Sequence, residues 1–457
     1  MRFFLTIALL GCSTLLYAQP DTLSLDAFFK LIKANHPLAK AAAIDVTIAK
    51  AGIMVARGAF DPVMHTNDGR KEVEGLLYYD QQQRELRIPT LLGVDIVTGT
   101  ESLSGTQTPS TETKGQNSYL GFSMPLAKGL LFDKRRAAIQ TARLFHRLSA
   151  EEQKSTLNDL LMDAATAYYN WREQTHLVQV TELSLANARQ RLHLMKTAFE
   201  LGDRPAIDTT EAQSLVRMLA LQHTEVRIQQ QVSRLGLENF LWEPENRPYR
   251  LSDRVQPENR IPTAPAVEEL LQSVAVHPLL IQYGFKLKTL NVERRLKAQS
   301  LLPGVYLKYN QLAKSYDITK TLQTPWLQNN YRYGLSVALP LRLSEARGEY
   351  RQARLKLQQA ALERDNKRWQ VETKLRQYHA EYLGWQQQQS LTKALLASLQ
   401  QLQNGEAQRF ANGESSLFLL NARELKVLEV QQKLIALEAK LAKAALRVQW
   451  AAGRLWE

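Results

Sequence analysis

The stretch FELGDRPAIDTTEA, from Phe199 to Ala212, interrupts a long run of helix-forming sequence and decides how the chain folds. Gly202 suits the left-handed residue that ends a helix, and Pro205 suits the first turn of the next one. Asp203 can accept hydrogen bonds from the free amides at the start of that second helix. We therefore predict the tip of a helical hairpin here.

A similar turn sequence occurs 211 residues later as FANGESSLFLLNARE. Phe410 precedes Gly413 by three positions there, as Phe199 precedes Gly202. Two further landmarks also occur twice: His36-Pro37-Leu38 with His277-Pro278-Leu279, and Pro125-Leu126 with Pro340-Leu341. The repetition indicates two copies of one design within the 457 residues, rather than two or three unrelated domains.

The duplication divides the chain into two repeats, 19–241 and 266–457. Each repeat is predicted to contain a helix, a strand pair, a long helix, a turn and a half-length helix. The prolines and charges of 242–265 are typical of a linker between them. Residues 1–18 have a positive charge, an apolar core and a final small residue, Ala18, which together predict a signal peptide.

Cys12 is the only cysteine in the chain, and it leaves a second interpretation of the leader open. It follows Leu9-Leu10-Gly11, so cleavage before Cys12 with lipidation of that residue is the alternative to cleavage after Ala18. Under either interpretation the sequence predicts no disulfide framework, zinc cluster or thiol nucleophile. The net charge is +13, but Lys and Arg are spread along helices beside Glu and Gln, which indicates solvated or interface faces rather than a nucleic-acid site.

Strands are predicted where alternation replaces helical spacing. Tyr331, Tyr333, Leu335, Val337 and Leu339 alternate with small or polar residues, which indicates one strand of a pair within about 303–341. The first pair lies within about 60–125. The offset between the repeats falls from 241 residues at the His-Pro-Leu motifs to 215 at the Pro-Leu pairs. Between these two landmarks the first repeat therefore holds 26 residues more than the second. The part from Glu85 to Gly105 allows another hairpin.

Helical spacing continues without a break over about Lys128 to Phe199 and over Ser344 to Phe410. At 1.5 Å per residue each helix spans on the order of 100 Å, which is typical of a coiled-coil rod. The expected seams are Leu185, Ala188, Leu192, Met195 and Phe199, and Leu434, Leu437, Leu441, Ala444 and Val448. Four strands, or six with the extra hairpin, are fewer than the roughly eight that close a membrane barrel. Several chains would therefore be needed for closure.

The sequences GFSMPLAKGLLFDKRRA and LSVALPLRLSEARGEYRQA, the turns GDRPAIDTTEA and GESSLFLLNARE, and their duplicated order resemble the TolC-like outer-membrane efflux family over nearly the whole mature chain. The resemblance implies a homotrimer in the outer membrane of a Gram-negative bacterium, with a 12-strand barrel built from four strands per chain. The expected fold class is therefore α+β, mainly α: duplicated coiled-coil rods that form an α-helical barrel, with a transmembrane β-barrel completed by trimerisation.

The resemblance also implies a passive exit duct for an efflux or type I secretion system, with an inner-membrane pump and a periplasmic adaptor as partners. Its two turns, at 200–206 and 411–416, would lie at the periplasmic end, where the adaptor docks and the channel opens. The residues carried over to this role are Gly202, Asp203, Pro205, Gly413, Glu414, Ser415 and Ser416. The alternative function is a periplasmic coiled-coil adaptor without a pore.

The sequence departs from the family beyond the second turn, where Leu419 and Asn421 stand in the neighbourhood of two aspartates in the best-known member. The nearest acidic candidates follow the first turn instead, at Asp208 and Glu211. Their alternative role is to stabilise the positive end of a helix dipole. We expect the acidic turn nearer the pore and the apolar turn nearer a neighbouring subunit or the adaptor.

Motifs for catalysis or metal binding are not found in the sequence, which holds no HExxH pair, phosphate-binding glycine loop or GxSxG elbow. His36 and His277 precede the duplicated prolines and are interpreted as helix starts. The run Lys134-Arg135-Arg136 is interpreted as a solvated helix face, or alternatively as a contact for acidic groups at the inner leaflet. We predict no enzymatic activity, cofactor or metal.

Overall fold

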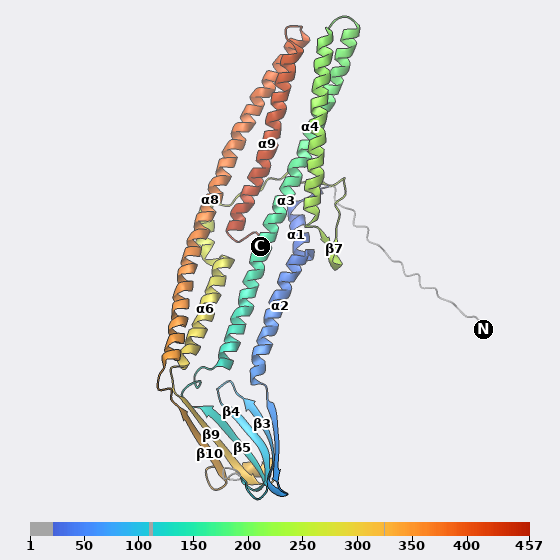
Figure 1. The fold of residues 1–457 in the computed structure, drawn as a ribbon. Coiled ribbons are helices and arrows are strands. Elements are labelled where there is room, and N and C mark those ends of the chain that lie inside the picture. Colours follow the sequence, from blue (N-terminus) through green and yellow to red (C-terminus); the bar gives the residue numbers. More distant parts are fainter. Residues whose placement is uncertain (1–21, 109–112, 324) are drawn as a thin grey trace, which may run out of the picture. The chain divides into compact units, whose positions relative to one another are not determined.

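The computed structural model describes residues 22–108, 113–323 and 325–457, and the expected signal peptide and Cys12 lie outside them. The described chain forms two compact units (Figure 1). The helical unit comprises the described part of Met1–Lys40 with Leu157–Leu271 and Lys374–Glu457. The sheet unit comprises Ala41–Thr156 and Gln272–Thr373.

Two very long helices, one from each repeat, confirm the predicted rods. They are α3 (Lys134–Glu200, 67 residues) and α8 (Ser344–Ala411, 68 residues). The shorter helices of the first repeat are α1 (Leu25–Asn35), α2 (Pro37–Arg57) and α4 (Ala206–Glu238). Those of the second are α5 (Val267–Gln272), α6 (Pro278–Gln299), α7 (Ile318–Gln323) and α9 (Leu417–Ala451).

The start of α3 at Lys134, instead of about Lys128, corrects the sequence prediction. Gly129 has a φ of +89°, which a helix does not allow. The Asp133 carboxylate then accepts a hydrogen bond from the backbone N–H of Arg136 at 2.9 Å, as an N-terminal cap does. The helix therefore begins where a capping side chain is available.

Both His-Pro motifs begin helices, as predicted. The His36 Nδ1 atom accepts a hydrogen bond from the Leu38 N–H at 3.2 Å, and the His277 Nδ1 atom accepts one from the Leu279 N–H at 3.1 Å. The first motif separates α1 from α2, and the second lies between a short 3-10 segment, Ser273–Val276, and α6. These two histidines serve as helix caps.

Six strands form one antiparallel sheet in the order β10-β9-β5-β4-β3-β2. Their bounds are β2 (Val63–Val73), β3 (Leu76–Pro89), β4 (Asp95–Ser104), β5 (Gly115–Pro125), β9 (Gly304–Lys314) and β10 (Tyr331–Ala338). The extra hairpin is thus confirmed as the β3–β4 hairpin. The sheet has six strands where the resemblance implied four per chain, because the first repeat contributes four strands and the second contributes two.

The core of the helical unit surrounds the middle of α3. Tyr168, Trp171, Phe28 and Ile32 are almost fully buried there. The Tyr168 hydroxyl donates to the Leu23 carbonyl at 2.7 Å and accepts from the Glu258 N–H at 3.0 Å. The linker is therefore tied into the core.

Short strands reinforce this attachment, since β1 (Thr22–Leu23) pairs in parallel with β8 (Gln256–Pro257). The predicted seam residues Leu185, Ala188, Leu437 and Leu441 are buried as well. Among the described residues, no helix carries an apolar stretch long enough to cross a membrane.

Candidate functional site

The first turn ends α3 with two backbone hydrogen bonds around Gly202. The Asp203 N–H donates to the Ala198 carbonyl at 2.9 Å, and the Gly202 N–H donates to the Phe199 carbonyl at 3.0 Å. Gly202 has a φ of +82°, which favours glycine because it has no Cβ. This is the Schellman arrangement that commonly ends helices.

The second turn repeats this geometry. Gly413 has a φ of +77°, its N–H donates to the Phe410 carbonyl at 3.1 Å, and the Glu414 N–H donates to the Arg409 carbonyl at 2.9 Å. The duplication seen in the sequence thus extends to individual hydrogen bonds.

The helices that follow the two turns start differently. Ser416 caps α9, because its hydroxyl accepts a hydrogen bond from the Leu419 N–H at 3.3 Å. The adjacent Ser415 hydroxyl donates to the buried carboxylate of Glu406. At the first turn Pro205 itself occupies the capping position of α4, and no side chain caps that helix. The expected capping role of Asp203 was therefore wrong, because Asp203 lies two residues before the capping position.

Arg204 connects the two turns. Its guanidinium lies over the Phe410 ring, 4.7 Å from the ring centroid, and also pairs with the Asp208 carboxylate at 3.9 Å. Asp208 belongs to the first turn of α4, where its negative charge also interacts favourably with the positive end of the helix dipole. The acidic candidate of the first turn is thus half-buried and paired within the chain.

A polar cluster lies beyond the turns and joins α3, α4 and α9; we call it the clasp, and it consists of Arg191, Glu211, Asn421 and Glu424. The Arg191 guanidinium binds both carboxylate oxygens of Glu424 and donates to Asn421 Oδ1 at 3.2 Å. Asn421 Nδ2 in turn donates to Glu211 Oε1 at 3.1 Å. Asn421, which marked the departure from the family, is only 5% exposed.

Apolar clusters lie on both sides of the clasp. Met195, Ala212 and Leu417 pack together on the side of the turns, and the other cluster consists of Leu185, Ala188, Leu215, Leu219 and Leu428. Polar bonds between two apolar layers are shielded from water and are electrostatically stronger than exposed ones. Arg191 and Glu424 were not predicted from the sequence as site residues. The sequence feature that could have indicated the clasp is the charged residue Arg191 beside the predicted apolar seam.

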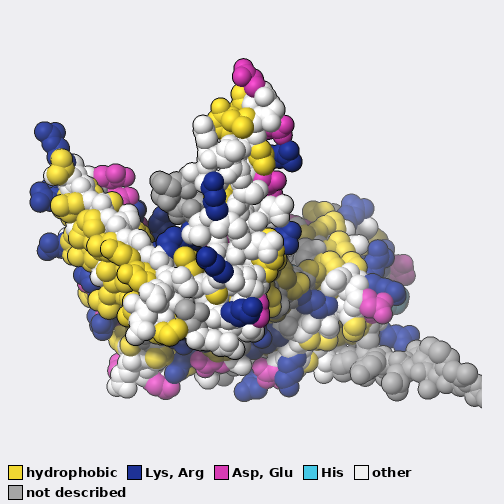
Figure 2. Space-filling view, turned by 90° about the horizontal axis from the view of Figure 1, so that it is seen from below, with side chains coloured by type: hydrophobic (Ala, Val, Ile, Leu, Met, Phe, Trp, Pro, Cys, Tyr) yellow, Lys and Arg dark blue, Asp and Glu magenta, His cyan; other side chains and the backbone are white. Residues whose placement is uncertain are grey.

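The sheet has two chemically different faces. Leu335 and Val337 of β10 lie on the apolar face with exposures of 59% and 62%, and their neighbours across β9 and β5 include Leu307 and Met124. On the other face Arg332 pairs with Glu101 at 3.0 Å. Figure 2, which views the sheet end, shows apolar side chains gathered on one side of it. The polar face also carries the Glu85–Arg87 ion pair at 2.9 Å.

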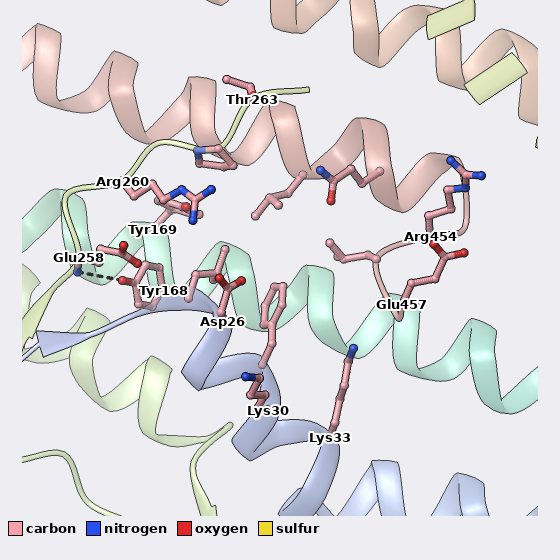
Figure 3. Close-up of a pocket in the computed structure, with 16 residues that line it drawn as sticks. Asp26, Lys30, Lys33, Tyr168, Tyr169, Glu258, Arg260, Thr263, Arg454 and Glu457 are labelled. Carbon is pink, nitrogen blue, oxygen red and sulfur yellow. Dashed lines mark hydrogen bonds between the residues drawn. The ribbon is translucent and has the colours of Figure 1, made fainter. Parts of the chain in front are cut away.

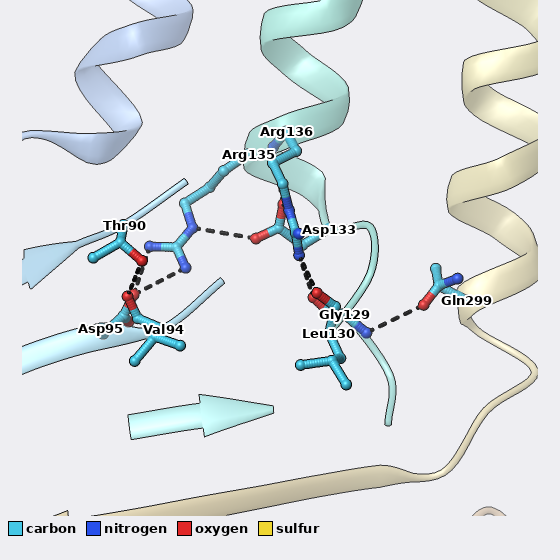
Figure 4. Close-up of polar contacts among 9 residues, drawn as sticks. All are labelled: Thr90, Val94, Asp95, Gly129, Leu130, Asp133, Arg135, Arg136 and Gln299. Atoms are coloured by element: carbon cyan, nitrogen blue, oxygen red, sulfur yellow. Dashed lines mark hydrogen bonds and ion pairs between the residues drawn. The ribbon is translucent and has the colours of Figure 1, made fainter. Parts of the chain in front are cut away.

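The basic run at the start of α3 is held inside the chain (Figure 4). The Arg135 guanidinium pairs with Asp95 at 3.0 Å, which fixes the helix to the start of β4. Arg136 pairs with Asp133 at 3.0 Å and donates to the carbonyls of Gly129 and Leu130 at 2.6 and 2.8 Å. The interpretation as a solvated helix face was therefore wrong for these two arginines, because loop carbonyls and carboxylates satisfy them.

A pocket of about 680 Å³ opens in the helical unit (Figure 3). Charges of both signs line it, including Asp26, Lys30, Glu258 and Arg260. Burial raises the pKa of the lining residue Tyr168 to about 12, and its hydroxyl is already bonded on both sides. No group of three or more His, Cys, Asp or Glu side chains in the described residues is arranged to hold a metal ion.

Known proteins share this organisation. Residues 29–241 match the outer membrane efflux protein family. The probable efflux pump outer membrane protein SepC of Pseudomonas putida is 33% identical over 96 residues, which cover 21% of this chain and 19% of SepC.

Two solved structures have the same fold. The Vibrio cholerae outer membrane protein VceC superimposes with a TM-score of 0.67 at 14% identity, covering 94% of this chain and 96% of VceC. The Campylobacter jejuni outer membrane channel CmeC gives 0.64 at 15% identity, covering 94% and 85%. Residues 29–241 are therefore similar to the outer membrane efflux protein family, and the described chain has the fold of these solved outer-membrane channels.

Proposed function

We propose that this protein is the outer-membrane exit duct of a tripartite efflux or type I secretion system and extends into the periplasm. It would conduct substrates passively, after an inner-membrane pump and a periplasmic adaptor have delivered them. The observation that carries the proposal is the two-faced sheet. Its exposed apolar face, with Leu335 and Val337, suits lipid, whereas the face with Arg332 and Glu101 suits a water-filled passage.

Exposed apolar residues on the helices support assembly from several copies. One stripe on α4 follows spacings of three, four and seven residues and consists of Met218, Leu221, Ile228, Val232 and Leu235, each at least 45% exposed. Such a stripe is typical of a coiled-coil seam, and in water it needs a partner. We therefore propose that neighbouring copies cover it in a homotrimer.

The two turns are the proposed adaptor-docking and gate end of the duct. The clasp supports this assignment, because it fastens the hairpin of α3 and α4 to α9 close to both turns. Opening by separation of the hairpins would have to break the Arg191–Glu424 pair. In this proposal Glu211 and Asp208 act through their partners in the chain, Asn421 and Arg204, rather than as free charges in the opening.

Fractionation and gel electrophoresis without heating test the proposed duct. We expect the protein in the outer-membrane fraction, migrating as a trimer that dissociates when the sample is heated. A soluble monomer in the periplasmic fraction would reject the duct and favour the periplasmic adaptor.

A further inference from the structure

We infer that all six strands of each copy enter one closed ring, in which β2 of one copy pairs with β10 of the next. A trimer would then close 18 strands, whereas the resemblance implied 12. The inference rests on the proposed outer-membrane duct and specifies how its strand-lined part is built. Because the diameter of such a ring grows about linearly with strand number, it would be about 1.5-fold wider than one of 12 strands.

The direction of the strands allows this closure. Every neighbouring pair in the sheet is antiparallel, so strands alternate in direction from β10 through to β2. Since each copy contributes an even number, β2 of one copy runs antiparallel to β10 of the next. Within the described chain, β2 and β10 each pair with one strand only, and their outer N–H and C=O groups need partners inside a membrane.

The stagger of the strands also fits a closed ring. Val63 is the first residue of β2. The residues aligned with it across the sheet are Arg87 on β3, Val97 on β4, Gly121 on β5, Asn310 on β9 and Arg332 on β10. Arg332 lies six residues before β10 ends at Ala338. With a rise of about 3.3 Å per residue and about 4.8 Å between strands, a stagger of six residues over six strands corresponds to a tilt of about 35°. Membrane strands tilt by about 35–45°.

The additional strands extend the face that carries Leu335. This face is apolar near the start of β2 and polar further along the strands, where Asp68 and Arg70 of β2 and Asp80 and Arg84 of β3 lie on it. Met64 of β2, Leu86 of β3 and Ile96 of β4 lie on the same face as Leu335 and are 67%, 37% and 40% exposed. The turn between β3 and β4 adds Leu91 and Leu92, exposed at 64% and 78%. A hairpin held in water outside the ring would leave this apolar surface uncovered. In the ring this apolar part faces lipid.

Cysteine cross-linking distinguishes this ring from one that leaves β2 and β3 out. If strand ends align across the boundary between copies, Leu335, fourth from the end of β10, lies opposite Thr66, fourth in β2. In a 12-strand ring it would lie opposite Thr98, which is fourth in β4. Opposed residues of antiparallel strands have Cα separations of about 4.5–5.5 Å, within the range for a disulfide.

We would oxidise the assembled protein carrying Leu335→Cys with Thr66→Cys, and compare it with Leu335→Cys with Thr98→Cys and with each single variant. The expected result is linked dimers and trimers for the Thr66 pair alone; Asp68→Cys covers a two-residue shift in register. Linking through Thr98, or no linking by any pair in an outer-membrane trimer, would overturn the 18-strand ring and leave the duct intact. A soluble monomer would instead defeat the duct itself.

Discussion

Breaking the clasp should make the proposed channel open more often. The decisive changes are Arg191→Met and Glu424→Gln, singly and together, because they remove the charges while keeping side chains of similar length. Each single change leaves one charge without its partner between apolar layers. The double change removes both charges, so its effect should be smaller than the two single effects added together.

The size of the effect follows from the burial of the pair. A hydrogen bond to a charged group contributes about 1.5–3 kcal/mol, whereas a fully exposed ion pair contributes about 0.2–1 kcal/mol. The side chains of Arg191 and Glu424 are 18% and 25% exposed, so the pair lies between these limits and nearer the first. We take about 1.5 kcal/mol per copy, which corresponds to roughly a tenfold change in the ratio of open to closed states.

Single-channel recording in planar bilayers measures this ratio. The matched control is Lys426→Met with Glu429→Gln, which removes an ion pair on the same helix whose side chains are 54% and 65% exposed. We expect the control to behave as the wild type, and each single clasp variant to raise the ratio of open to closed states by at least about tenfold, the change that follows from one copy. Wild-type currents from trimeric Arg191→Met and Glu424→Gln would refute the argument that the clasp restrains opening.

Three further outcomes are expected. Gly413→Ala should destabilise the hairpin by about 1–2 kcal/mol, because a Cβ is strained at its φ of +77° even though nothing crowds it; an unchanged melting temperature would contradict this. Ser416→Ala should cost about 1 kcal/mol through the lost cap of α9, measured by thermal unfolding, whereas Ser416→Asp should retain most of the stability. Burial lowers the pKa of His36 from 6.5, against a smaller opposing effect of a hydrogen bond with the Asn239 backbone, so its neutral form favours the folded state. His36 therefore makes its full contribution to the stability of the folded state above about pH 6.5. This contribution is lost as the pH falls through the lowered pKa of His36 in the folded protein. Melting curves of His36→Asn should show a weaker loss of stability in acid than the wild type, and parallel pH profiles would argue against a role for His36.

The helices could be predicted closely where local chemistry determines their ends. The half-length helix predicted after the second turn is present as α9, with a serine cap before it and Gly453, which has a φ of +70°, just after it. Both His-Pro motifs were also predicted as helix starts, because a proline interrupts the preceding helix. The start of α3 was misplaced because Gly129 and Asp133 act there through backbone geometry and a carboxylate cap, neither of which interrupts apolar periodicity.

Contacts between distant segments could not be predicted. Arg136 looks solvated in sequence, but loop carbonyls six and seven residues earlier accept its hydrogen bonds. The partner of Arg191 is Glu424, 233 positions away, so only the folded chain brings them together. Likewise, alternation in the sequence predicts strands, but the position of β5 beside β9 depends on how the two repeats join. The extra hairpin was predicted only as a possibility, since its register depends on β5.

The clasp is not repeated at the related position of the duplicated fold. With the 211-residue offset of the turns, the counterparts of Arg191, Glu424, Asn421 and Glu211 are Leu402, Gln213, Thr210 and Ala422. These residues cannot form an ion pair, and Leu402 is 51% exposed. The fold is duplicated, whereas the clasp occurs at one of the two related positions. A trimer would therefore hold three clasps among its six hairpins. The two hairpins of a chain would then be unequal at the proposed gate, and the proposed restraint on opening would act where α3 and α4 meet α9.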